Sequence, residues 1–104
     1  MTLENLKERC EKNGFRYAYG KFEQATALPH LVAAEISTNN FNADNKVYKK
    51  KNSIKLDYTY KSKDKNLENK IEEEILNDVV WKKTDETYLS DEEVWQVSYF
   101  FEFI

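Results

Sequence analysis

The stretch IKLDYTYK (residues 54–61) decides the fold, because apolar and polar side chains alternate along its whole length. One side takes Ile54, Leu56, Tyr58 and Tyr60, and the other takes Lys55, Asp57, Thr59 and Lys61. A period of two is typical of a β-strand that buries one face and exposes the other to solvent. We therefore predict a half-buried strand here. Residues 46–52 before it are predicted to hold a short strand at Val47-Tyr48 and a lysine-rich turn.

The chain begins with a predicted amphipathic helix. Thr2 can accept the free amide hydrogens of its first turn, and Gly14 supplies the left-handed residue that ends it. One side of the helix carries Leu3, Leu6 and Cys10. This spacing predicts a short helix with one buried stripe.

Two strands and a long loop are predicted between this helix and the deciding stretch. The first strand runs from Phe15 to Phe22, with a bulge or bend at Gly20. The second runs from His30 to Ile36, directly after Pro29, which cannot donate to a ladder. Residues 37–45 are rich in Asn, Ser, Thr and Asp, which bond their own backbone, so we expect a loop there.

A second helix is predicted after the deciding stretch. Ser62 or Asp64 can cap its start, and it runs to about Asn77. Its apolar stripe consists of Leu67, Ile71, Ile75 and Leu76. We expect the acidic side chains of Glu68, Glu72, Glu73 and Glu74 to form solvated faces rather than a metal site.

The end of the chain predicts a hairpin. Its strands are Val79 to Tyr88 and Val94 to Phe103, joined around Leu89-Ser90-Asp91-Glu92-Glu93. The last strand is apolar on one face and also carries Phe100 on the other, so we expect it to be central or covered on both sides. At 104 residues the chain has the size of a single domain, residues 1–104. The predicted class is α+β, in the order α-β-β-β-β-α-β-β, with a mostly antiparallel sheet and both helices on one face.

The residue types that common active sites require are scarce. His30 is the single histidine and Cys10 the single cysteine, and neither has a partner at catalytic or metal-ligand spacing. The two glycines, Gly14 and Gly20, lack the pattern of a phosphate-binding loop. We therefore predict no enzyme activity, no catalytic residues, no cofactor and no metal, although two of the 19 acidic residues could still converge as a carboxylate pair.

Charge and hydropathy narrow the classes of partner. A net charge of −3 argues against general binding to nucleic-acid backbones. Stacking of single-stranded bases on strand aromatics beside Lys49-Lys50-Lys51 remains a rival to aromatics that fill the core and an interface. The charged first 14 residues lack the apolar core of a signal peptide, and no apolar run is long enough for a membrane span, so we expect no membrane partner and a cytoplasmic location.

Several blocks of the sequence resemble a known family of phage proteins. These blocks are residues 28–32, 39–48, 54–60, 67–72 and 94–102. They resemble the small neck and tail-completion proteins, of the tail terminator or head-tail connector type, of long-tailed phages and prophages of Gram-positive bacteria. The resemblance implies a ring, commonly a hexamer, that ends the tail tube and joins it to the head connector. It also implies assembly in the bacterial host cytoplasm and a final place in the virion.

A ring of identical subunits needs two different contact surfaces on each copy. The candidate surface for self-assembly, or for docking tail tube and connector proteins, is the polar loop and the lysines after it: Asn39, Asn40, Phe41, Tyr48, Lys49, Lys50 and Lys51. Phe41 could instead fold back onto the domain's own sheet. Two other functions remain open, a small acidic inhibitor of the immunity type that covers a basic enzyme, and an enzyme with a carboxylate site.

Overall fold

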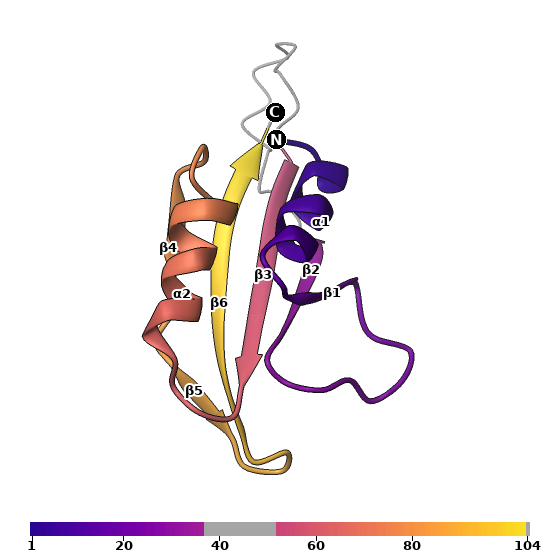
Figure 1. Cartoon of the computed structure of the whole chain (residues 1–104), viewed down its shortest axis with the longest axis vertical. Coiled ribbons are helices and arrows are strands. Elements are labelled where there is room, and N and C mark those ends of the chain that lie inside the picture. The colour runs from indigo at the N-terminus through magenta and orange to yellow at the C-terminus, as the bar shows by residue number, and fades with distance from the viewer. Residues whose placement is uncertain (37–51, 104) are drawn as a thin grey trace, which may run out of the picture.

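A computed structural model describes residues 1–36 and 52–103 of the chain (Figure 1). In chain order its elements are α1 (Leu3–Lys12), β1 (Arg16–Tyr19), β2 (His30–Ile36), β3 (Asn52–Tyr60), α2 (Lys65–Lys70), the π-helical turn η1 (Ile71–Ile75), β4 (Trp81–Lys83), β5 (Thr87–Leu89) and β6 (Val94–Phe103). The loop predicted at 37–45 and the strand predicted at Val47-Tyr48 lie outside the described residues.

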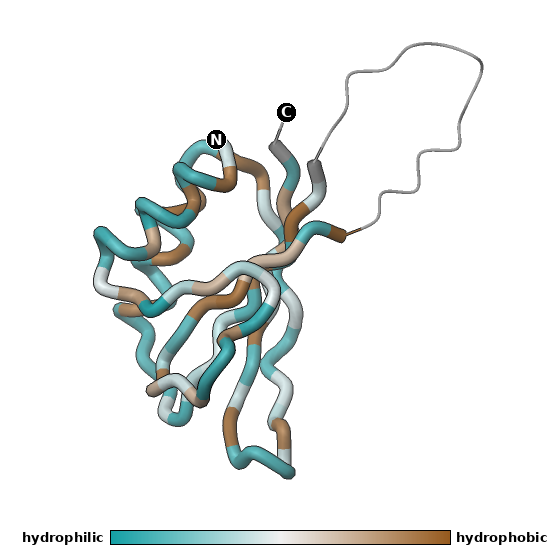
Figure 2. Tube along the Cα trace, turned by 90° about the vertical axis from the view of Figure 1, so that its right-hand side faces the viewer, coloured by the Kyte–Doolittle hydropathy of each residue, from teal (hydrophilic) through white to brown (hydrophobic). Residues whose placement is uncertain are grey.

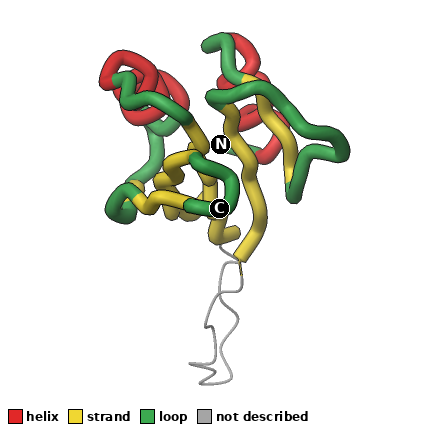
Figure 3. The backbone as a smooth tube through the Cα atoms, turned by 90° about the horizontal axis from the view of Figure 1, so that it is seen from below, coloured by secondary structure: helices red, strands yellow, loops and turns green. Residues whose placement is uncertain are grey.

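The strands form one sheet in the order β1-β2-β3-β6-β4, and β5 also pairs with β6. All pairs are antiparallel except β1 with β2. Both helices lie on the same side of the sheet, as the view along the strands shows (Figure 3). The predicted α+β class with a mostly antiparallel sheet is therefore confirmed, and β6 is central as its apolar residues on both faces predicted.

The parallel pairing of β1 with β2 differs from the hairpin that neighbouring strands suggest. β1 is also shorter than predicted, because Gly20, with φ of 83°, turns the chain out of the strand. The connection 20–29 then returns the chain to the end where β1 began. The Phe22 ring on this connection lies 4.9 Å from the ring of His30, so the connection packs against the sheet face that the helices leave free.

The core lies between the helices and the facing side of the sheet. In Figure 2, brown apolar residues lie among teal and pale ones along the strands. The largest side chains that are fully buried are Tyr58, Tyr60, Tyr99, Leu6, Leu31, Ile54, Leu56, Ile71, Ile75 and Leu76. Thr2 caps α1 through a capping box, and Gly14, with φ of 84°, follows the helix end, both as predicted.

One arginine joins the ends of the two helical segments. The guanidinium of Arg9, in α1, donates two hydrogen bonds to the carboxylate of Asp78, of 2.8 and 3.0 Å, and a third to the carbonyl oxygen of Ile75. The two hydrogen bonds from Arg9 to Asp78 lower the pKa of Asp78 below its ordinary value. A bidentate pair of this geometry fixes both partners, so it holds the turn after η1 against α1.

The second helix changes its hydrogen-bond pattern after one and a half turns. Asp64 caps α2 by accepting hydrogen bonds from the backbone amides of Asn66 and Leu67, as predicted. The amide of Leu76 donates to the carbonyl of Ile71 over 2.9 Å, which is the i to i+5 bond of a π-helix. Ile71, Ile75 and Leu76, at the two ends of this turn, are all buried in the core.

The predicted strand Val79 to Tyr88 is wrong as one continuous strand. β4 pairs Lys83 with Tyr99, and β5 pairs Thr87 with Gln96. Residues 84–86 lie between these two pairs, whereas β6 has only residues 97 and 98 there. One extra residue of this kind is a β-bulge, and it reverses which side chains face which side of the sheet. Glu86 therefore turns toward the helices, where an unbroken strand would have pointed it away.

The cap of α2 gives a test of this local structure. Replacing Asp64 with Ala removes both hydrogen bonds to the first turn, and we expect the free energy of unfolding to fall by about 1 kcal/mol. Urea unfolding followed by circular dichroism measures it. Asp85→Ala is the matched control, because Asp85 is exposed and makes no hydrogen bond or ion pair with the described residues. Equal losses in the two variants would contradict the capping role.

Candidate functional site

The seven interface residues predicted from the sequence all lie between β2 and β3, outside the described residues. They are Asn39, Asn40, Phe41, Tyr48, Lys49, Lys50 and Lys51. The role of this segment therefore stays a prediction. Its two flanking strands meet at one end of the sheet, where Ile36 pairs with Ser53 and Ser53 with Glu102.

A polar cluster lies between α2 and the sheet. Its centre is Glu68, whose side chain is 1% exposed and accepts a hydrogen bond of 2.8 Å from the ammonium of Lys63. The second oxygen of this carboxylate lies 3.8 Å from the ammonium of Lys83. The prediction that Glu68 lies on a solvated face is wrong. A buried carboxylate is tolerated here because two lysines reach it from the rim.

The cluster continues on both sides of Glu68. Glu86 accepts hydrogen bonds from the hydroxyl of Tyr60 and the ammonium of Lys63, and these bonds lower its pKa. Burial, aided by the bond to Glu86, raises the pKa of Tyr60. The β-bulge is what brings Glu86 to this side of the sheet, so backbone geometry and charge pairing support each other.

Glu72 completes the cluster at its other end. It accepts a hydrogen bond of 2.8 Å from Lys83 and one of 2.7 Å from the hydroxyl of Tyr99. Burial alone would raise the pKa of Glu72, but these two bonds outweigh it and the pKa lies below its ordinary value. Each carboxylate is thus occupied by a lysine or a tyrosine, which is the arrangement of a polar contact that holds a helix on a sheet.

Two buried oxygens in this region have no hydrogen-bond partner among the described residues, the hydroxyl of Tyr58 and one oxygen of Glu68. Burial raises the pKa of Tyr58 to about 12. Within residues 1–36 and 52–103, no group of three His, Cys, Asp or Glu side chains is arranged to hold a metal ion.

The sheet face opposite the helices is covered in part by the connection 20–29. Between this connection and the sheet lies a hollow of about 680 Å³, whose floor includes His30, Asp57, Thr59 and Gln96. Burial lowers the pKa of His30, and its ring packs on Phe22, in agreement with a packing role. The polar side chains of the floor pair among themselves, since Ser98 donates to Asp57 over 2.5 Å and Gln96 to Thr59 over 3.3 Å.

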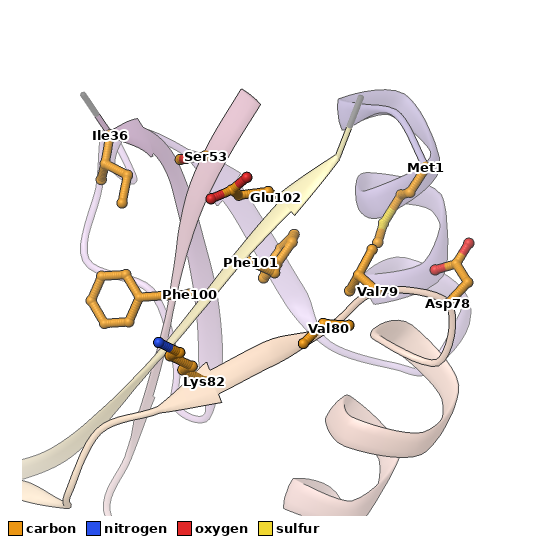
Figure 4. A pocket seen from close by; sticks show the side chains of 10 residues that line it. All are labelled: Met1, Ile36, Ser53, Asp78, Val79, Val80, Lys82, Phe100, Phe101 and Glu102. Atoms are coloured by element: carbon orange, nitrogen blue, oxygen red, sulfur yellow. The ribbon is translucent and has the colours of Figure 1, made fainter. Parts of the chain in front are cut away.

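A second hollow, of about 650 Å³, lies at the end of the sheet where β6 finishes (Figure 4). β4 begins only opposite Phe101, so the last residues of β6 have no strand beside them on that edge among the described residues. Val80, at this gap, is 91% exposed. Figure 4 shows Ile36 and Phe100 on the same side of the sheet, with Lys82 next to Phe100.

The opposite end of β6 carries an exposed aromatic pair. Tyr88 and Trp95 face each other across β5 and β6, their ring centres are 5.1 Å apart, and they are 47% and 38% exposed. Between them, the turn contains Asp91, Glu92 and Glu93. We call the residues 88–95 the tip. An exposed aromatic pair is typical of a protein-binding surface, and the acidic turn beside it gives this surface a negative charge.

The sequence reasoning missed the tip, although a signal for it was present. Tyr88 and Trp95 each stand two residues from the turn 90–93, which is where a hairpin places a cross-strand pair. Val80 carried no such signal, because its exposure follows from where β4 starts and from the path of the turn before it.

Comparison with known proteins identifies no relative: no family model, curated protein or solved structure matches the chain. Among the described residues, no helix has the length and apolar character needed to cross a membrane. The functional argument therefore rests on the surfaces described above.

The polar cluster gives a prediction about pH. Folding lowers the pKa of Glu72, so its ionised form stabilises the protein at pH values above its ordinary pKa of 4.5. This contribution is lost as the pH falls through the folded-state pKa. Glu72→Gln should therefore lower the free energy of unfolding near neutral pH by up to about 1 kcal/mol. The difference from the unmodified chain should shrink at about pH 3.

Urea unfolding at the two pH values measures this difference. Glu74→Gln removes the same charge from the same helix at an exposed position and is the matched control. A Glu72→Gln effect that does not change with pH would contradict the role of the ionised carboxylate.

Proposed function

We propose that this chain is a structural protein of the tail terminus or neck of a long-tailed phage, which assembles into a ring and joins the tail to the head connector without catalysing a reaction. The observation that carries this proposal is the presence of two unlike apolar surfaces on one small subunit. One is the hollow beside Val80, and the other is the aromatic pair of the tip. They lie at opposite ends of β6 (Figure 1).

A ring of identical subunits requires this kind of asymmetry. A two-fold dimer uses the same patch twice, whereas a ring joins one surface of each copy to a different surface of the next. The two surfaces also give a reason for the exposed apolar area, since Val80, Tyr88 and Trp95 are all large hydrophobic residues in contact with water on the isolated subunit.

The assignment to a phage tail rests on the sequence resemblance. The segment 39–48 belongs to that resemblance, and the described residues Ile36 and Ser53, which precede and follow it in the sequence, both line the hollow. Under this proposal, the segment contacts a neighbouring subunit or the tail tube. Assembly takes place in the host cytoplasm, and the virion is the final location under this proposal.

The acidic residues in and next to the tip favour one other function, that of an inhibitor. Residues 84–98 include Asp85, Glu86, Asp91, Glu92 and Glu93 and no basic residue. An acidic surface with an aromatic anchor fits the basic substrate site of an enzyme, and such pairs associate quickly through charge steering. This function needs only one contact surface, so it leaves the hollow beside Val80 unexplained.

The proposal predicts self-association into a closed ring. Light scattering coupled to size-exclusion chromatography over a wide range of protein concentrations should show an oligomer of fixed size, and six subunits agree best with the resemblance. Purified tail tubes or the neighbouring connector protein, when added, should bind the ring. Genes for these proteins should flank the gene for this chain.

A monomer at every concentration that also fails to bind tail tubes or connectors would contradict the proposal. A monomer that binds a single basic enzyme tightly and blocks it would favour the inhibitor instead.

A further inference from the structure

We propose that the tip of one subunit inserts into the hollow beside Val80 of the next, so that the aromatic pair Tyr88 and Trp95 and the end of β6 form one head-to-tail contact. This inference rests on the proposed self-assembly and names its two surfaces. The occupant of the hollow is thus a second copy of this chain.

The contact must join different copies. The tip is formed where β6 begins, at Val94 and Trp95, and the hollow where it ends, at Phe100 to Glu102. β6 is a single extended strand of ten residues, so its two ends cannot meet within one subunit. Figure 1 shows the tip at one end of the molecule, and the beginning of α1 and the end of β6 at the other.

The hollow suits an aromatic side chain in size and chemistry. Its volume of about 650 Å³ lies within the range of roughly 300–1,000 Å³ that accepts drug-sized ligands. Its apolar lining includes Ile36, Val80 and Phe100. Tyr and Trp are the side chains most often found as anchors in such pockets, because they bury a large area with few rotatable bonds.

Charge orients the contact. Lys82, on the rim of the hollow, is exposed and makes no ion pair or hydrogen bond with the described residues. The acidic residues of the tip, Asp91 to Glu93, would lie near it. Of the two carboxylates at the hollow, Asp78 is already paired with Arg9, which leaves Glu102 as the one that opposes an acidic partner. Lys82 attracts the acidic residues of the tip and Glu102 repels them, so the tip should enter the hollow from the side of Lys82.

Open sheet edges offer a competing way to associate, and the structure disfavours it. β1 has four residues, β4 and β5 have three each, and a bulge separates β4 from β5. Short and bulged edge strands pair poorly with other edges. Contact through side chains at the two ends of β6 is consequently the better route to a ring.

Cross-linking tests the contact directly. A chain with Val80→Cys and Ser90→Cys places one thiol at the hollow and one in the turn of the tip, without removing Tyr88 or Trp95. A short bis-maleimide should produce a ladder of covalent oligomers from this chain. A mixture of the two single variants should give heterodimers and no longer species. Cys10 should not interfere, because it is buried and burial raises its pKa to about 12.

Association measured by sedimentation provides the second test. Val80→Glu should weaken association at least ~10-fold by placing a charge in the hollow. Val80 is almost fully exposed in the subunit, so the fold should be retained, and circular dichroism checks this. Tyr19→Glu is the matched control, since Tyr19 is 50% exposed on the far edge strand β1 and its replacement should leave association unchanged.

A charge exchange tests the orientation. Lys82→Glu should weaken association, and adding Asp91→Lys to the same chain should restore part of it, because each copy then offers the reversed pair. Lys12→Glu makes the same change of charge at an exposed position at the end of α1, which belongs neither to the tip nor to the lining of the hollow, and should have no effect.

The outcomes separate this inference from the proposed function. The contact of tip and hollow is overturned if Val80→Glu still forms the oligomer and the chain with Val80→Cys and Ser90→Cys gives no ladder. Ring assembly is not contradicted by that result. If Tyr19→Glu loses association and Val80→Glu does not, the interface lies at the β1 edge, and the contact of tip and hollow is likewise overturned. A chain that never associates, and never cross-links, contradicts both.

Discussion

A β-strand places successive side chains on opposite faces of its sheet, and in this protein the helices cover one face only. β3 and β6 pair along nine residues, from Asn52 with Phe103 to Tyr60 with Trp95. Their helix-facing positions hold the buried tyrosines and aliphatic residues of the core. The same pairing must present nearly as many side chains to the other side. Part of that face is polar and internally paired, as with Asp57 and Ser98, and part of it is apolar, as with Phe100.

The bulge between β4 and β5 shows how one residue redistributes side chains between the two faces. With the extra residue, Glu86 and Tyr88 both lie on the helix side, although an unbroken strand continuing from Lys83 would have placed Thr87 there. Glu86 can then take hydrogen bonds from Tyr60 and Lys63, and Tyr88 can stack beside Trp95. The polar cluster that holds α2 and the aromatic pair of the tip therefore depend on the same local irregularity.

The features that follow from side-chain periodicity could be predicted from the sequence. The alternation at residues 54–60, the caps Thr2 and Asp64, and β2 from His30 to Ile36 belong to this group. The parallel β1 could not be predicted, because its pairing is decided by the path of residues 20–29 and by no pattern within the strand. The burial of Glu68 was missed for a similar reason, since a carboxylate becomes tolerable inside only when Lys63 and Lys83, from distant parts of the chain, approach it.

The difference in length between β6 and its neighbours explains why both exposed surfaces occur at its ends. β6 has ten residues, whereas β4 covers three positions near its end and β5 three at its beginning. The last residues of β6 therefore extend past β4 and form the wall of the hollow. At the other end, Tyr60, the last residue of β3, pairs with Trp95 of the tip, and the turn of the β5–β6 hairpin extends beyond it. A strand has direction, so its two ends are chemically different. A contact made once between the different ends of neighbouring copies is consequently head-to-tail, which is the type of contact that produces rings when the rotation from copy to copy closes.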